Sequence, residues 1–272
     1  MSVLFAGPFV GEFGWELFQW QGYIRTLSKQ FDKTIVASRP FSKVLYEDFC
    51  DEFIPFDPNT YECAGWTNYF YKYRGGLHEK YNPDKFLYID TESDGIDFTS
   101  SVKPTMISYG SKNKDKKYPD VIIHARMVTM KDIYKQSRNW TLHNCQEFVK
   151  KLISNGITVG SIGISKQSMY ISGTDNYMDI DLSDLANVLA NTKMIIGPSS
   201  GPMHFATLCR CPQFLWTSNK PLLGQGNREN YISKWNPFNT KVRVYDDEGW
   251  NPSVDNIYNG VMDFYEEIIN DR

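Results

Sequence analysis

A buried strand that leads through a turn of small residues into a helix restricts the fold of this chain more than any other feature. The apolar run 194–196 is typical of such a strand, residues 197–202 are Gly, Pro and Ser only, and residues 204–208 predict the start of a helix. The first N–H groups of a helix lack intrahelical partners and lie at the positive end of its dipole, so this junction favours an anion such as phosphate. The alternative is an ordinary connection in which Ser199 or Ser200 caps the helix.

Short apolar runs alternate with amphipathic segments along most of the chain. Strands are expected at 3–8, 34–37, 52–56, 86–89, 105–109, 121–125, 158–162, 194–196 and 211–216. Helices are expected at 15–29, 41–49, 144–154, 182–190 and 253–269. This alternation favours an α/β fold with parallel sheets.

The polar and charged segment 110–117 separates two such series of strands and helices and is expected to be a linker. The two series predict Rossmann-like domains at 1–115 and 118–254. In open α/β sheets a ligand usually binds beyond the carboxyl ends of the strands, so we expect the two domains to face each other across a cleft.

Composition excludes several classes of protein. The chain has 272 residues, of which 41% are hydrophobic, so it is a folded protein rather than a disordered one. Its formal net charge of −3 lacks the basic excess of a protein that grips duplex DNA, although a local basic patch stays open. No stretch reaches the roughly 18 apolar residues of a membrane span, and no secretion signal is recognised at the start. We expect a cytoplasmic protein.

An aromatic and basic segment at 59–82 interrupts the alternation. It includes Tyr69 and Arg74 among several other tyrosines, lysines and glycines. A loop of this length inside a compact domain is usually functional or mobile. It is interpreted either as a loop that faces a substrate or as one that packs on the surface.

The motifs together resemble the GT-B glycosyltransferases, and most closely glycosyltransferase family 9, the bacterial heptosyltransferase type. The specific match is residues 182–190 (LSDLANVLA) followed by 196–206 (IGPSSGPMHFA), which are similar to the family signature in order, spacing and type. Two short elements upstream, Gly11-Glu12 and Arg138-Asn139-Trp140, resemble the family's G-D and K-x-W elements. The chain departs from the family pattern because it has Ser199 and Glu12 where Asp is usual and Arg138 where Lys is usual.

The resemblance implies a GT-B fold in which helix 255–272 returns toward the N-terminal domain. That domain would bind the acceptor, through or near Gly11, Phe13, Trp15, Tyr69 and Arg74, and the C-terminal domain would bind a nucleotide sugar. The donor diphosphate would be held at Arg126, Arg138, Ser199, Ser200, Gly201 and His204, because arginine matches phosphate oxygens well. His124-Ala125-Arg126 resembles a segment of fucosyltransferases that bind GDP-sugars, so the nucleotide base stays open.

Transfer of a sugar from a nucleotide sugar needs a base for the acceptor hydroxyl and positive groups for the leaving diphosphate. Glu12 is predicted to be the base because its aromatic neighbours would raise the proton affinity of its carboxylate, and Glu16 is the second choice. A single displacement predicts inversion at the anomeric carbon. Asp179-Ile180-Asp181 has the spacing of a metal-binding pair, but a helix cap is the simpler role, so neither a metal nor a cofactor is predicted.

Two other functions stay open beside transfer to a saccharide or a lipid-linked saccharide. One is transfer to a hydroxymethylated base in DNA, as in phage DNA-modifying enzymes that share the GT-B architecture, with the basic and aromatic loop gripping the strand. The other is a binding module for a nucleotide sugar without catalysis. The sugar, the acceptor and the oligomeric state are left undetermined by the sequence.

Overall fold

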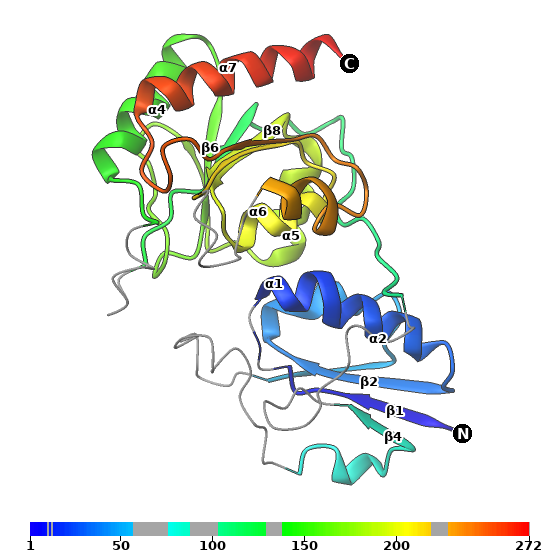
Figure 1. The fold of residues 1–272 in the computed structure, drawn as a ribbon. Helices are drawn as coiled ribbons and strands as arrows, with labels where there is room; N and C mark the ends of the chain where they lie inside the picture. The colour runs from blue at the N-terminus through cyan, green and yellow to red at the C-terminus, as the bar shows by residue number, and fades with distance from the viewer. Residues whose placement is uncertain are drawn as a thin grey trace. The chain divides into compact units, whose positions relative to one another are not determined.

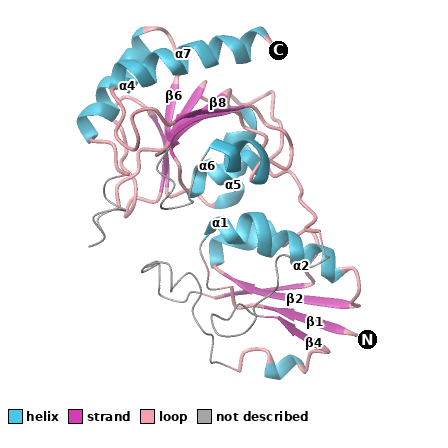
Figure 2. Ribbon diagram, in the orientation of Figure 1, coloured by secondary structure: helices cyan, strands magenta, loops and turns pink. Residues whose placement is uncertain are grey.

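The computed structural model describes residues 1–9, 11, 13–56, 76–87, 103–128, 138–218 and 228–271. The chain divides into two compact units, Met1–Met106 and Ile107–Arg272 (Figure 1). Each unit has one parallel sheet with helices beside it, so the chain is an α/β protein (Figure 2). In the described parts of the chain no helix is long and apolar enough to cross a bilayer.

The first unit has a four-stranded parallel sheet in the order β3-β2-β1-β4. Its strands are β1 (Val3–Ala6), β2 (Lys33–Ser38), β3 (Glu52–Pro55) and β4 (Lys85–Leu87). Because side chains alternate along a strand, Phe5, Ile35 and Ala37 share one face and form a small buried cluster. These strands confirm the expectations from the sequence for this part of the chain.

Helical segments cover both faces of this sheet. The expected helix at 15–29 is present as three consecutive pieces: α1 (Phe13–Trp15), the π-helical η1 (Glu16–Trp20) and α2 (Gln21–Ser28). They lie on one face, and the short 3₁₀ helix η4 (Glu79–Tyr81) lies on the other (Figure 1). The helix expected at 41–49 is instead the 3₁₀ helix η2 (Pro40–Leu45), followed by turns. Ser42 in this 3₁₀ helix and Tyr46 just after it both donate hydroxyl hydrogen bonds to Glu16.

The second unit has a six-stranded parallel sheet in the order β10-β9-β8-β5-β6-β7. Its strands are β5 (Val121–Ile123), β6 (Val159–Gly163), β7 (Asp175–Met178), β8 (Met194–Pro198), β9 (Gln213–Trp216) and β10 (Val242–Tyr245). The sequence analysis missed β7 and β10. Both are edge strands with several exposed or half-buried polar residues, so neither has the continuous apolar run that marks the buried inner strands.

Four helices pack on this sheet, two on each face. The pair α4 (Leu142–Ser154) and α7 (Val254–Asn270) lies on one face, and the pair α5 (Leu182–Asn191) and α6 (Gly201–Leu208) lies on the other (Figure 1). Thr141, Asp181 and Ser253 cap α4, α5 and α7 through their side chains.

The C-terminal helix α7 belongs to the second unit. All of its buried side chains lie in the core of the second unit: Ile257, Val261, Phe264, Tyr265 and Ile268. Their spacing of three and four residues forms a single apolar stripe, and that stripe is covered by α4 and β9.

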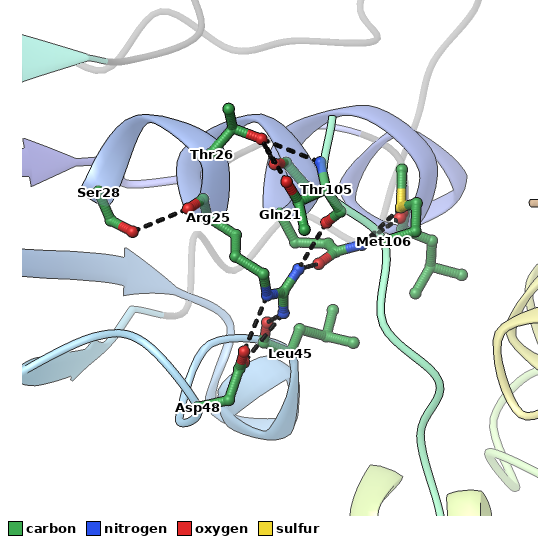
Figure 3. A network of polar contacts seen from close by, with 10 residues as sticks. Gln21, Arg25, Thr26, Ser28, Leu45, Asp48, Thr105 and Met106 are labelled. Carbon is green, nitrogen blue, oxygen red and sulfur yellow. Dashed lines mark hydrogen bonds and ion pairs between the residues drawn. The ribbon is translucent and has the colours of Figure 1, made fainter. Parts of the chain in front are cut away.

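The segment that joins the two units is anchored at both ends. Thr105 is bonded to α2: its backbone N–H donates to Thr26 Oγ1 (3.0 Å), and its carbonyl accepts from Arg25 (3.1 Å), as Figure 3 shows. Arg25 also forms a two-point ion pair with Asp48, which ties α2 to the end of η2. Four residues further on, the Tyr109 N–H donates to the Leu208 carbonyl (3.0 Å) of the second unit.

Neither expectation for this segment is confirmed. Residues 105–109 form no strand, because their backbone groups bond to helices rather than to a neighbouring strand. The charged stretch 110–117 begins along α5 rather than as a free linker, since Ser111 and Asn113 donate their N–H groups to Asn187 and Asn191. The division between units therefore falls at Met106 and Ile107 instead of near residue 116.

Candidate functional site

Polar side chains gather at the carboxyl edge of the sheet in the second unit. His124 follows β5 directly, and Ser199 and Ser200 follow the neighbouring strand β8, with which β5 is paired. Gly197 allows this close approach, because a Cβ atom there would lie 2.9 Å from the His124 carbonyl oxygen. The pairing of β5 with β8 therefore places the histidine ring beside the serine turn.

His124 bridges two serine hydroxyls. Its Nδ1 lies 2.9 Å from Ser200 Oγ, and its Nε2 lies 3.0 Å from Ser168 Oγ. The side chain is buried, and burial, together with the positive charge of Arg126, lowers the pKa of His124 to about 3. The ring is therefore neutral near pH 7 and has one N–H donor and one acceptor nitrogen for the two hydroxyls.

The N-terminus of α6 has no side-chain cap. Ser200 occupies the N-cap position with extended backbone angles, but its hydroxyl contacts His124 instead of the helix. Pro202 lies in the first turn and has no N–H group. Met203 has no exposed surface, so the amide of the half-buried Gly201 is the donor that the first turn of α6 can offer to an anion. The capping alternative considered from the sequence does not apply to Ser200.

Ser199 and Arg138 are joined at the same turn. The Ser199 N–H donates to the Trp216 carbonyl (3.0 Å), and the Arg138 guanidinium donates to the Ser199 carbonyl. The Arg138 guanidinium carbon also lies 4.5 Å from the centre of the Trp250 ring. Two sequence-predicted donor-site residues are thus brought together, with the arginine held by a carbonyl and an aromatic face.

The hydroxyl of Ser199 is buried and lies 2.8 Å from the hydroxyl of Tyr231. Tyr231 lies in the π-helical segment η6 (Asn230–Lys234). In this chain a serine–tyrosine contact therefore fixes the turn where the resembling family usually has a carboxylate.

His204 lies in an aromatic cluster one turn into α6. Its ring stacks on Tyr231, with centroids 5.1 Å apart, and meets Trp235 edge to face at 4.8 Å. Burial, reinforced by the charge of Arg138, lowers the pKa of His204 to about 3. The residue as a whole is half-buried, and its Nδ1 atom is buried.

Arg126 lies just beyond His124 and donates to the Asn139 side-chain oxygen (2.6 Å). Asn139 also accepts from the Val128 N–H and donates to the Val128 carbonyl, so it fixes the chain after β5. Arg126 is buried and Arg138 is half-buried. Both lie at the same edge of the sheet as the serine turn, because Arg126 follows β5 and Arg138 donates to the Ser199 carbonyl. These positive charges suit an anionic ligand.

Sequence reasoning did not find several residues that complete this site. Ser168, Tyr231, Trp235 and Trp250 come from three segments outside the signature, with Tyr231 and Trp235 both at η6. Only the aromatic character of three of them was a signal, and aromatic residues are too common in this chain to single out these positions. Ser168 had no signal, since its role depends on the reversal of the chain after β6.

The aspartates of the Asp-x-Asp pair have structural roles. The Asp181 side chain accepts from the Asp184 N–H (2.7 Å) and caps α5, as expected. Asp179 binds both the backbone N–H and the hydroxyl of Ser165. Within the described ranges, no group of three His, Cys, Asp or Glu residues could hold a metal ion.

Glu16 lies fully buried in the first unit. Its carboxylate accepts hydrogen bonds from three hydroxyl groups and pairs with one guanidinium, contributed by Ser38, Ser42, Tyr46 and Arg39. An acceptor hydroxyl has no access to a carboxylate with no exposed surface. The structure thus corrects the second choice of base. Glu16 is a buried structural residue at the start of η1, and its contacts anchor η1 to η2 and the residues on either side of η2.

Gly11, which precedes the first-choice base in the sequence, is bonded to the same arginine as this anchor. The Arg39 guanidinium, which pairs with Glu16, also donates to the Gly11 carbonyl. Phe13 packs edge to face on Phe41, with ring centroids 5.8 Å apart, and the Trp15 side chain is partly exposed. Glu12, Tyr69 and Arg74 lie outside the described residues, so their predicted roles stay predictions.

The fold is that of known glycosyltransferases. Over 98% of this chain and 97% of the other, it superposes on a glycosyltransferase family 9 protein from Veillonella parvula, with a TM-score of 0.61 and 11% identity. The ADP-heptose lipopolysaccharide heptosyltransferase II of E. coli covers 100% of this chain and 99% of its own length, with a TM-score of 0.57 and 14% identity.

A second E. coli heptosyltransferase, WaaC, in a structure with ADP, covers 98% of this chain and all of its own length, with a TM-score of 0.53 and 12% identity. No family model matches the sequence, and no curated protein matches it significantly. The comparisons therefore show a GT-B fold.

Proposed function

We propose that this chain is a glycosyltransferase that moves a sugar from a nucleotide-diphosphate sugar to an acceptor hydroxyl, with inversion and without a metal ion. The observation that carries the proposal is the junction of β8 and α6. There the uncapped first turn of a helix and the guanidinium of Arg138 meet around Ser199 and Ser200. A diphosphate fits such a site, because its two phosphate groups can accept from the two groups of donors at once.

The position of this junction supports the same conclusion. It lies at the carboxyl edge of a parallel sheet, where α/β proteins bind their ligands. Nucleotide sugars or nucleotides are named for similar structures, which include one heptosyltransferase with ADP and another with an ADP-heptose. For this chain we propose the second unit as the donor domain, the first as the acceptor domain, and a saccharide or lipid-linked saccharide as the acceptor.

A thermal-shift screen against ADP-, UDP- and GDP-sugars would identify the nucleotide, because a ligand that binds only the native state raises the melting temperature. One nucleoside should stabilise the protein far more than the other two. If none of the three changes the melting temperature at millimolar concentration, the donor proposal is wrong.

Arg138→Ala is the variant that tests the diphosphate site. Its affinity for the nucleoside diphosphate found in the screen should fall by roughly tenfold or more, because a charge-assisted contact is lost. Arg243→Ala is the matched control, since Arg243 lies on β10 of the same unit and pairs with Glu267 at the surface. Calorimetry that finds equal affinities for the two variants would refute the assignment of Arg138.

Glu12 is proposed as the base. Glu12→Gln should slow the transfer of sugar strongly and leave the dissociation constant for the donor nearly unchanged, because a base acts on the acceptor hydroxyl. An NMR assignment of the product anomer tests the mechanism independently. Retention of configuration would exclude a single displacement by a Glu12-activated hydroxyl.

A further inference from the structure

Arg39 is a buried cation of the first unit to which the proposed reaction gives no role. It directly follows β2, and 7% of its surface is exposed. Its guanidinium has partners on two segments: Nη1 lies 3.4 Å from the Glu16 carboxylate, and Nη2 donates to the Gly11 carbonyl. The guanidinium carbon also lies 5.5 Å from the centre of the Phe9 ring. Arg39 therefore joins Glu16 to the segment that follows β1.

The segment that follows β1 is attached to the end of β2. The Phe9 N–H donates to the Ala37 carbonyl (2.9 Å), and Gly7 lies so close that a Cβ atom there would be 2.1 Å from the same oxygen. Arg39 adds a further contact at Gly11. Gly7, Phe9 and Gly11 are thus each held by residue 37 or residue 39.

The Gly11 carbonyl belongs to the peptide group that joins Gly11 to Glu12, the proposed base. A peptide group is planar, so a bond to its oxygen restricts the orientation of the whole group. Glycine by itself gives this part of the chain the widest range of backbone angles of any residue. The bond from Arg39 reduces that range, and its donor is charged, which makes it roughly twice as strong as a neutral hydrogen bond.

Stability alone does not explain the pairing of Arg39 with Glu16. Replacement of a buried ion pair by apolar residues of similar volume is often neutral or stabilising, because both charges lose their hydration on burial. The Glu16 carboxylate is already fixed by three hydroxyl donors, from Ser38, Ser42 and Tyr46. A fixed carboxylate holds one nitrogen of the guanidinium, and the rigid fork of arginine then directs the other nitrogen to Gly11.

We propose that Arg39 is a positioning residue for the base. It fixes the peptide group between Gly11 and Glu12 and so restricts the directions from which the Glu12 carboxylate takes the proton of the acceptor hydroxyl. This inference rests on the proposed function, because it takes Glu12 as the base. Arg39 acts on the reaction through the backbone, without touching the donor or the acceptor.

The first test is hydrogen exchange on the full chain, which needs no ligand. Arg39→Lys keeps a charge beside Glu16 but has one nitrogen for two partners, so the Gly11 carbonyl should lose its donor. Backbone amides in peptides that cover residues 7–15 should then exchange at least about fivefold faster than in the native protein. Arg25→Lys is the matched control, because Arg25 is also buried in the first unit and also pairs with a carboxylate. Its exchange over the same residues should remain native.

The second test measures hydrolysis of the ADP-, UDP- or GDP-sugar that stabilises the protein most in the thermal-shift screen. Water takes the place of the acceptor: its oxygen bonds to the anomeric carbon as the bond to the diphosphate breaks, and its proton goes to Glu12. Arg39→Lys should lower kcat for release of the nucleoside diphosphate by about tenfold, because a small misplacement of a catalytic group is costly. The dissociation constant for the donor should stay within about twofold of the native value.

A double-mutant cycle shows whether Arg39 acts through the base. In a Glu12→Gln background, Arg39→Lys should change kcat less than about twofold, because no base is left to position. Arg25→Lys should leave kcat within about twofold of the native value in both backgrounds.

The outcomes are distinct. Native hydrogen exchange or native kcat in Arg39→Lys would overturn the positioning role and leave the proposed function intact. An equal loss of kcat in the native and Glu12→Gln backgrounds would also overturn it, because Arg39 would then not act through Glu12. Native kcat in Glu12→Gln would overturn the choice of base and this inference together. A native protein that binds none of the three donors would overturn the proposed function and, with it, this inference.

Discussion

Replacement of Glu16 by glutamine is expected to lower the melting temperature of the first unit by roughly 12 °C. The carboxylate has no exposed surface, accepts from three hydroxyls and pairs with the Arg39 guanidinium at 3.4 Å. Glutamine replaces one acceptor oxygen by a donor, so at least one hydroxyl loses its acceptor. It also leaves the buried charge of Arg39 without its counter-ion.

Loss of one partner of a buried ion pair costs about 3–5 kcal/mol, and the long separation here favours the lower value. The first unit spans Met1–Met106. For a domain of this size a loss of 1 kcal/mol lowers the melting temperature by roughly 4–8 °C, so about 3 kcal/mol corresponds to at least roughly 12 °C. Arg39 also binds the Gly11 carbonyl, and the loop before the predicted base should therefore loosen as well.

Differential scanning calorimetry measures this effect directly, with Glu52→Gln as the control. Glu52 lies in the same unit and pairs with Lys33, but both side chains are more than 30% exposed, so its replacement should cost less than about 1 kcal/mol. A Glu16→Gln protein that melts within about 2 °C of the native protein but transfers no sugar would refute the structural role. Glu16 would then have to act in catalysis.

Three other changes have expected outcomes. The pKa of His124 is about 3 in the folded protein and near 6.5 in the unfolded chain, so only the unfolded state binds a proton at this residue as the pH falls below 6.5. The free energy of unfolding should therefore drop by about 2 kcal/mol between pH 6.5 and 5. Denaturant titrations should show a weaker dependence of stability on pH for His124→Asn than for the native protein. Gly163→Ala should destabilise the protein by more than about 1 kcal/mol, because Gly163 has a φ of +136° and faces Ser168. A chemical denaturation curve that matches that of the native protein would contradict this. Arg25→Ala should cost about 3 kcal/mol by removing the buried fork that binds Asp48 (Figure 3), and an unchanged melting temperature would show that this network is not stabilising.

The inner elements of both units could be predicted from the sequence because each has a strong local signal. Strands β1, β2, β5 and β8 each contain a run of three or more apolar residues. Helices α4, α5 and α7 show apolar residues at helical spacing with Thr, Asp or Ser as caps. Burial on one or both faces imposes these patterns directly on the residue order. The edge strands β7 and β10 escaped because one side of each meets solvent and tolerates polar residues.

The candidate site could be predicted only in part. The strand–turn–helix junction around Ser199 and Ser200 follows from the local residue pattern, whereas Arg126 and Arg138 were indicated by the resemblance to glycosyltransferase family 9. The partners that fix these residues were not predictable, because Tyr231 and Ser168 reach the site through tertiary contacts that no local pattern encodes.

Glu12 and Glu16 show the same division between sequence and structure. In the sequence they are two carboxylates four residues apart in a loop that leads into a helix, and each is a reasonable base. Only the packing of segment 38–46 against η1 brings three hydroxyls and a guanidinium to Glu16 and removes it from solvent.

The sequence by itself determined the α/β class, the inner strands and helices, and the anion-favouring junction at 197–202, because these depend on periodicity and on residue types within one short segment. The tertiary structure decided that α7 belongs to the second unit, that Glu16 is an anchor, and that Ser200 is bonded to His124 rather than to its own helix. Those outcomes depend on which distant groups meet once the sheets have formed. A buried donor or acceptor takes whichever partner the fold places within reach, and residue order alone does not specify that partner.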